Sequence, residues 1–189
     1  MKNFVIGLFV IGLTTLGFSQ QRKGNVESVI LKDVLVTHTK SDVPIMNVNF
    51  SYINEVQNKT TAKYVKSLES VASRYNVMES PTFDGRDEPF KTIFRGTKGY
   101  IIATYDSNGK ILTTQERYRD VKLPKKLVKS VLKEFPESHF LKAVHYISYN
   151  HKRDLKKTYR IKIMNDDQKK NLRITADASD NLLSMVIEK

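Results

Sequence analysis

Four histidines are the residues of this chain best suited to binding a transition metal or transferring a proton near neutral pH: His38, His139, His145 and His151. The last three are spaced six residues apart, which places side chains on one side of an extended strand. A strand is expected only over Leu141–Tyr149, however, so His139 and His151 fall at its ends or beyond them. No acid or further histidine stands at ligand spacing beside them. We therefore predict neither a metal site nor a cofactor.

Carboxylates gather in three short segments. Asp84, Asp87 and Glu88 lie between two prolines, and paired carboxylates can transfer protons or hold calcium. Their spacing is not that of a calcium loop, so we interpret them as a solvated loop. Segments 106–109 and 166–167 contain the residues that hairpin turns require, and we interpret both as turns.

Other catalytic patterns are missing from the sequence. The chain has no cysteine, so it offers no thiol nucleophile and no disulfide. The glycines of segment 96–99 do not have phosphate-loop spacing, and no serine stands in a nucleophile elbow. We predict no catalytic residue and no enzymatic activity. A hydrolase is the last alternative, and it would require His145 to lie in a pocket beside a carboxylate.

Two amphipathic helices are expected to cover the core. Apolar residues recur at helical spacing over residues 64–75 and again over residues 127–135. Asn58 or Thr60 is expected to accept hydrogen bonds from the free amides that open the first helix. Pro124 suits the first position of the second helix, where its missing amide proton costs nothing.

Extended segments are expected wherever branched and aromatic residues alternate with polar ones. In chain order they are Val26–Thr37, Pro44–Ile53, Phe90–Arg95, Tyr100–Tyr105, Lys110–Tyr118, Leu141–Tyr149, Thr158–Met164, Asn171–Ala176 and Leu182–Glu188. Alternation means that one face of each strand packs and the other meets water. We predict an α+β fold of two tandem units, each a helix packed on an antiparallel sheet. The two units are expected to pack together or to share one continuous sheet.

The unit is repeated, and its motifs carry a resemblance. Residues 105–112 read Tyr-Asp-x-x-Gly-Lys-Ile-Leu, Leu123-Pro124 opens a helix that ends at Phe135-Pro136, and residues 177–183 repeat the hairpin. This pattern, over residues 100–189, resembles the PepSY-like domains of exported bacterial proteins. The resemblance implies the beta-lactamase-inhibitor-like architecture of tandem helix-plus-sheet units. It also implies a non-catalytic module that binds or restrains another protein, and it supplies no catalytic residues.

The chain divides into four expected segments. Residues 1–19 have a basic start, an apolar run and small residues at their end, which is typical of a cleaved secretory signal. Residues 20–57 are expected to be an N-terminal extended segment, 58–120 a first, degenerate unit, and 121–189 the second unit. We therefore predict a periplasmic or secreted protein with no transmembrane segment after signal cleavage.

The charge balance bears on the kind of partner. Lysine and arginine number 32 against 20 acids, for a formal net charge of +12. Such a balance favours an acidic protein or an anionic envelope component as partner. Nucleic acid is not expected, because an exported protein rarely meets it and lysine far outnumbers arginine here. The oligomeric state stays open.

One surface is predicted to carry the binding. Arg160 and Lys162 point away from the packed side of their strand, and Arg173 does so from the neighbouring strand. We expect these three cations to lie together on the sheet face opposite the helix and to bind a partner there. This binding-module hypothesis also predicts no deep pocket and no cluster of perturbed titratable groups. The main alternative is a surface protein that binds anionic lipid or glycan through its net charge.

Overall fold

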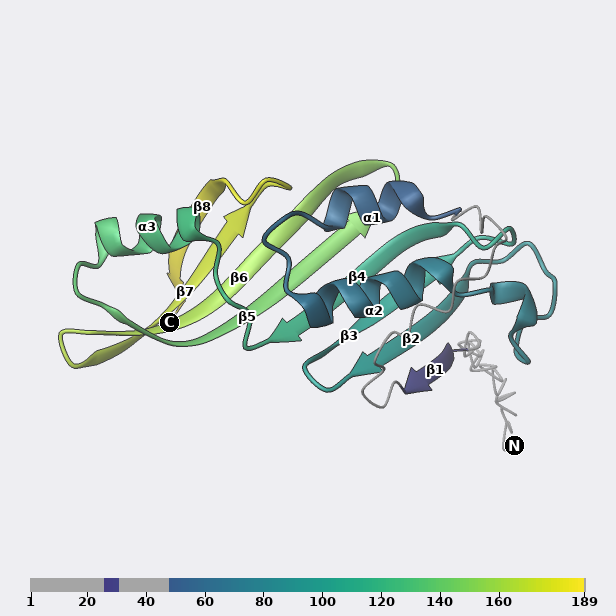
Figure 1. Cartoon of the computed structure of the whole chain (residues 1–189), viewed down its shortest axis with the longest axis horizontal. Coiled ribbons are helices and arrows are strands. Elements are labelled where there is room, and N and C mark those ends of the chain that lie inside the picture. The colour runs from purple at the N-terminus through teal and green to yellow at the C-terminus, as the bar shows by residue number, and fades with distance from the viewer. Residues whose placement is uncertain (1–25, 31–47, 189) are drawn as a thin grey trace, which may run out of the picture.

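A computed structural model describes residues 26–30 and 48–188 of the chain. Its centre is one eight-stranded sheet in which every strand lies beside its neighbours in sequence, from β1 to β8 (Figure 1). The strands are β1 Val26–Ile30, β2 Phe90–Gly96, β3 Gly99–Tyr105, β4 Ile111–Arg119, β5 His139–Asn150, β6 Arg153–Asn165, β7 Gln168–Ala176 and β8 Leu182–Glu188. β1 pairs with β2 in parallel, and all other pairs are antiparallel. The sheet is therefore mixed.

Three α-helices lie on one face of this sheet: α1 Phe50–Val56, α2 Lys63–Arg74 and α3 Lys125–Glu134. The short 3₁₀ helix Val77–Glu79 follows α2. Figure 1 shows α1 and α2 together over one half of the sheet and α3 alone beside β7 and β8. We call the face that carries the helices the inner face and the opposite one the outer face.

The inner face carries two hydrophobic cores. The first core packs under α1 and α2 and is rich in aromatic side chains; its large members include Tyr52, Phe94, Tyr105, Tyr118 and Tyr149. The second core packs under α3 and is mainly aliphatic; its members are Leu127, Val131, Phe135, Tyr159, Ile161, Ile163, Leu172, Ile174 and Ala176. The register of β5 on β6 places both cores on the same side, since the inward-facing Ile147 lies opposite Lys157 and His145 opposite Tyr159.

The predicted fold class of two tandem helix-on-sheet units is wrong. β5 pairs with β4 over residues 144–150 and with β6 on its other side, so no edge separates a first sheet from a second. The parallel strand β1 and the third helix α1 also have no place in such a repeat. The repeated hairpins thus belong to one continuous mixed sheet.

The strand expected over Pro44–Ile53 is also wrong where the structure describes it. Residues 44–47 lie outside the described residues, and Phe50–Val56 is helix α1. The alternation was misleading because Val48 and Phe50 are exposed, whereas Tyr52 and Val56, four residues apart, are the buried pair. A spacing of four residues places both side chains on one face of a helix.

Details at the element ends bear out some expectations and correct others. Gly109 has φ +78 in the turn between β3 and β4, which confirms the predicted hairpin there. Asp166 and Asp167 both have positive φ between β6 and β7, as a tight turn requires. The cap expected from Asn58 or Thr60 is absent, because α2 begins after Ala62 without a side-chain cap.

The expected signal segment 1–19 lies outside the described residues, as does most of segment 20–57. Within the part of the chain that the structure describes, no helix has the length and apolar character needed to span a membrane.

Candidate partner-binding face

The structure brings the three predicted cations together on the outer face. Arg160 of β6 lies directly opposite Arg173 of β7, and Lys162 follows Arg160 on the same face of β6. All three side chains are exposed, while the alternate residues Tyr159, Ile161 and Ile163 of β6 are buried on the inner face. Period-two alternation along long strands therefore produces this arrangement.

An acid from the edge strand lies between the two arginines. Glu188 of β8 accepts a hydrogen bond from Arg173 Nε at 2.6 Å, and its Oε1 lies 3.5 Å from Arg160 Nε. The arginine side chains are about half exposed, at 50% for Arg160 and 47% for Arg173. Exposed ion pairs contribute only about 0–1 kcal/mol, so Glu188 orients these cations more than it stabilises the fold.

A fourth cation, Lys142, belongs to this group, and sequence reasoning missed it. Lys142 of β5 lies directly opposite Lys162, at the point where the β5–β6 register shifts between Phe140 and Lys142. Lys142 lies on the near side of this bulge and keeps the phase of Val144 and Tyr146, so the alternation of β5 directs it to the outer face. We call Lys142, Arg160, Lys162 and Arg173 the cationic patch.

An aromatic ring lies beside the patch. The guanidinium carbons of Arg117 and Arg160 stand 5.9 and 5.4 Å from the centre of the Tyr146 ring, and Arg117 Nε donates to the Tyr146 hydroxyl at 3.4 Å. Arginine held against a ring keeps its planar donors directed outward. The outer face thus presents ordered cations that contact one another through Tyr146 and Glu188.

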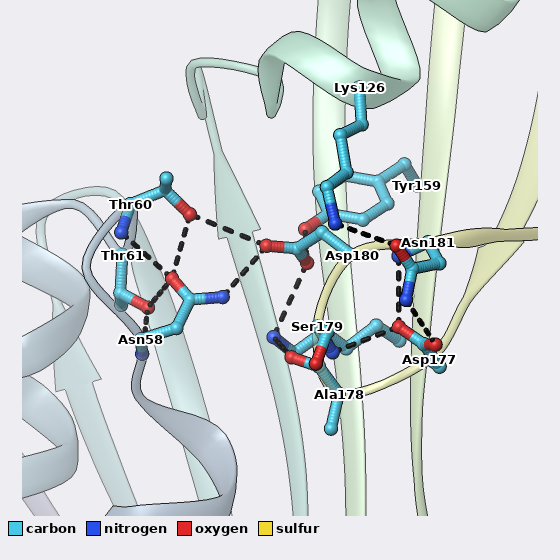
Figure 2. A network of polar contacts seen from close by, with 11 residues as sticks. Asn58, Thr60, Thr61, Lys126, Tyr159, Asp177, Ala178, Ser179, Asp180 and Asn181 are labelled. Carbon is cyan, nitrogen blue, oxygen red and sulfur yellow. Dashed lines mark hydrogen bonds and ion pairs between the residues drawn. The ribbon is translucent and has the colours of Figure 1, made fainter.

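The inner face holds a polar network around Asp180, which links the two cores (Figure 2). Asp180 Oδ1 accepts a hydrogen bond from the Tyr159 hydroxyl at 3.0 Å and pairs with Lys157 Nζ at 3.3 Å. Its Oδ2 accepts from Asn58 Nδ2 at 2.7 Å and from the Thr60 hydroxyl at 3.3 Å. Lys157 and Asp180 are 2% and 6% exposed as side chains, so this is a buried ion pair.

The β7–β8 turn positions this aspartate. Asp177 Oδ1 accepts from the backbone amides of Ser179 and Asn181 at 2.9 and 2.8 Å, which fixes the turn. The hydrogen bond from Asn181 Nδ2 to Asp177 Oδ2, followed by these backbone bonds, lowers the pKa of Asp177. Asp180 has φ +59, a conformation that aspartate tolerates better than most residues, and its carboxylate turns inward. Lys126 of α3 donates to Asn181 and ties the helix to the same turn.

His145 lies next to this network. It lines a cavity of about 20 Å³ that Asp180 also lines, and its ring stacks on Tyr159 with ring centres 4.2 Å apart. Burial, followed by the positive charge of Lys157, lowers the pKa of His145 to about 3, so the ring is neutral at pH 7. The cavity has room for about one water molecule, so it offers a substrate no access to His145.

The other described histidines, His139 and His151, lie away from the polar network around Asp180. His139 is exposed at the start of β5, and His151 Nδ1 lies 3.0 Å from the Leu112 carbonyl oxygen. The described residues contain no group of side chains that could hold a metal ion, and His38 lies outside them.

A pair of carboxyl groups is buried in the first core. Glu116 of β4 accepts hydrogen bonds from Tyr52, Thr114 and Tyr118 at 2.6–2.8 Å, and Glu69 of α2 faces it. Burial raises the pKa of both, and the charge of Glu116 raises that of Glu69 further. The expectation of no perturbed titratable cluster is therefore wrong. Exposures of 0% and 3% keep both carboxyls out of reach of a substrate.

No protein-family model, curated protein or solved structure shows a significant match to this chain. The resemblance to PepSY-like domains therefore stays a prediction from the residues quoted for it.

Proposed function

We propose that this protein is an exported, non-catalytic binding module that docks an acidic envelope protein on the cationic patch of its outer face. The observation that carries the proposal is the pairing of like charges on adjacent strands. Arg160 lies opposite Arg173, and Lys162 lies opposite Lys142. Like charges directly opposite one another destabilise a sheet. Glu188 compensates the two arginines, whereas no ion pair within the described residues compensates Lys162 and Lys142.

Two further features support the same surface. Glu188 is the single acid that forms ion pairs with the patch among the described residues, which leaves a local excess of positive charge. No described helix lies on the outer face, so an incoming acidic surface could reach these cations directly. Export rests on residues 1–19, which lie outside the described part of the chain.

The test compares charge reversal on the patch with the same reversal elsewhere. The patch variant carries Arg160→Glu, Lys162→Glu and Arg173→Glu. The control variant carries Lys63→Glu, Lys110→Glu and Lys133→Glu, three exposed lysines of the helices and a turn. We expect the patch variant to lose acidic proteins that the wild type and the control both capture from a native envelope extract, with identification by mass spectrometry.

Several results would decide against the proposal. Capture of the same proteins by all three chains would overturn the site. Equal loss from both variants, with binding to anionic vesicles or polysaccharide that falls steeply with salt, would support the net-charge alternative instead. Because three glutamates near Glu188 could disturb folding, a variant with glutamine at the same three positions is measured in parallel, after circular dichroism has confirmed its fold.

A further inference from the structure

A hollow lies where β4 leaves the sheet. The pairing of β4 with β5 ends at Arg119 opposite Val144, so residues 139–143 of β5 have no β4 partner. The chain then crosses this edge, and the amide of Asp120 donates to the Ala143 carbonyl oxygen at 3.1 Å. An open cavity of about 680 Å³ is lined by this connection, by the first turns of α3 and by the start of β5. This cavity is open to solvent, so it is a surface hollow and not the deep pocket whose absence was expected.

The walls of the cavity are mainly apolar. Val121 and Leu123 come from the β4–α3 connection, Val128 from α3, and Phe140 and Leu141 from β5. Leu141 is 49% exposed and Phe140 37%, although both lie at the edge of the second core. A volume of about 300–1,000 Å³ with apolar walls is typical of small-molecule sites.

Lysines surround these walls. Lys122, Lys125, Lys129 and Lys142 line the cavity, and all four are exposed. None of them forms an ion pair within the described residues, and Asp120 is the one acid that lines the cavity. Lysine stems extend apolar walls while their ammonium groups stay in water. The site therefore matches a ligand with an apolar body and an anionic head.

We infer that this cavity binds a free long-chain fatty acid as its carboxylate. An acyl chain has no polar groups to satisfy, so it suits walls made of aliphatic and aromatic side chains. A peptide chain would bring amides and carbonyls that these walls leave without hydrogen-bond partners, at a cost in free energy. The carboxylate lies among the lysine ammonium groups, where opposite charges attract.

The first experiment titrates the full chain with decanoate, dodecanoate and tetradecanoate by calorimetry, below the concentrations at which these aggregate. We expect saturable one-to-one binding. Burial of each added methylene tightens binding about fourfold, so each step in this series tightens it about fifteenfold. Dodecanol is expected to bind more weakly than dodecanoate, and dodecyltrimethylammonium more weakly still. Equal binding of the three head groups would overturn the inference.

Matched variants distinguish the contribution of the apolar walls to binding from that of the surrounding lysines. Leu141→Gln should weaken both dodecanoate and dodecanol, whereas Lys125→Gln with Lys129→Gln should weaken dodecanoate about threefold to tenfold and leave dodecanol unchanged. Leu183→Gln, at a 65% exposed leucine of β8, and Lys133→Gln of α3 are the controls and should change neither. Unchanged dodecanoate binding by the Leu141→Gln variant would refute the site.

Further binding measurements test whether the cavity binds another class of ligand. Binding of phosphatidylglycerol vesicles or of an acidic leucine-containing peptide that depends on Leu141, without binding of free dodecanoate, would also refute the fatty acid. The variant with glutamine at Arg160, Lys162 and Arg173 should bind dodecanoate as the wild type does, because none of these residues lines the cavity and no acid is placed opposite Lys142, which belongs to both sites. Failure of the proposed function and failure of this inference are thus distinguishable.

Discussion

The two cores of the inner face differ in how completely they are covered. Two helices and the segment after them cover the first core, and its buried tyrosines Tyr52, Tyr105, Tyr118 and Tyr149 are at most 2% exposed. One ten-residue helix covers the second core, and apolar side chains remain exposed around it. These are Leu132, Phe140, Leu141, Leu182, Leu183 and Ile187.

The difference locates the surfaces available for binding. The first core satisfies its buried carboxyl of Glu116 with hydroxyl groups of its own, so it is a closed structural unit. The second half of the sheet holds both the cavity beside α3 and the cationic patch on the outer face. One continuous sheet thus combines a closed half with a half that leaves surface free for ligands.

The largest effect is expected at Asp180, which pairs with Lys157 and accepts hydrogen bonds from Asn58 and Thr60 of the first half. Asp180→Asn removes the charge that compensates Lys157, whose side chain is 2% exposed. An unpaired buried charge costs about 3–5 kcal/mol, so the free energy of unfolding measured in urea should fall by that amount. The double variant Lys157→Met with Asp180→Asn contains no buried charge and should recover part of the loss. A loss below about 1 kcal/mol in Asp180→Asn would show that the halves are joined in another way.

The second prediction concerns acid sensitivity at the same junction. His145 has a folded-state pKa of about 3 against 6.5 ordinarily, so between these values the unfolded chain binds a proton that the folded chain does not. Its contribution to stability is complete above pH 6.5 and is lost as the pH falls, at up to about 1.4 kcal/mol per pH unit.

His145→Phe keeps a ring against Tyr159. It should reduce the fall in the free energy of unfolding below pH 6.5, as measured by urea titrations at a series of pH values. His139→Gln, at an exposed histidine of the same strand, should retain it. If the free energy of unfolding fell equally steeply with pH in both variants, His145 would not be the cause of the acid sensitivity.

The first core should respond to pH in the opposite direction. The raised pKa of Glu69 means that the folded chain holds its proton above pH 4.5, where the unfolded chain releases it. This contribution is complete below pH 4.5 and is lost as the pH rises through the raised pKa. The positive charge of Lys157 and the nearby Gln57 amide favour ionised Glu69 and limit the effect.

Glu69→Gln should therefore reduce the decline of stability toward alkaline pH, as measured by thermal unfolding. The exposed Glu79→Gln is the control and should not change the pH profile. If Glu69→Gln steepened the decline, the first core could not be the closed, proton-holding unit described above.

Local patterns predicted local structure well. The alternation of Tyr159, Ile161 and Ile163 with polar residues correctly indicated a strand with one buried face, and Asn108-Gly109 correctly indicated a tight hairpin. The outward direction of Arg160 and Arg173 followed from the same alternation. These features depend on residues within one strand or one turn, so the sequence contains the necessary information.

Features that depend on distant residues were not predictable in this way. Glu69 stands at the buried position four residues after Val65, and Glu116 stands at a buried position of β4. Neither local sequence indicates that the two carboxyl groups lie close together in the fold. The sequence around Asp180 indicates only a turn, because its hydrogen-bond partner Asn58 is 122 residues away along the chain. The sequence left open whether the two expected units share one sheet, because the pairing that joins them, between β4 of the first and β5 of the second, leaves no mark in either strand alone.

The order of the strands has a consequence for how the chain folds. From β2 to β8 each strand pairs with the strand just before it, so most loops that must close are short and carry a small entropic cost. Chains with such local contacts fold faster than sheets assembled from distant strands. The contact between Asn58 and Asp180 joins residues 122 apart in sequence, so we expect the polar junction to form after the hairpins on either side of it have assembled.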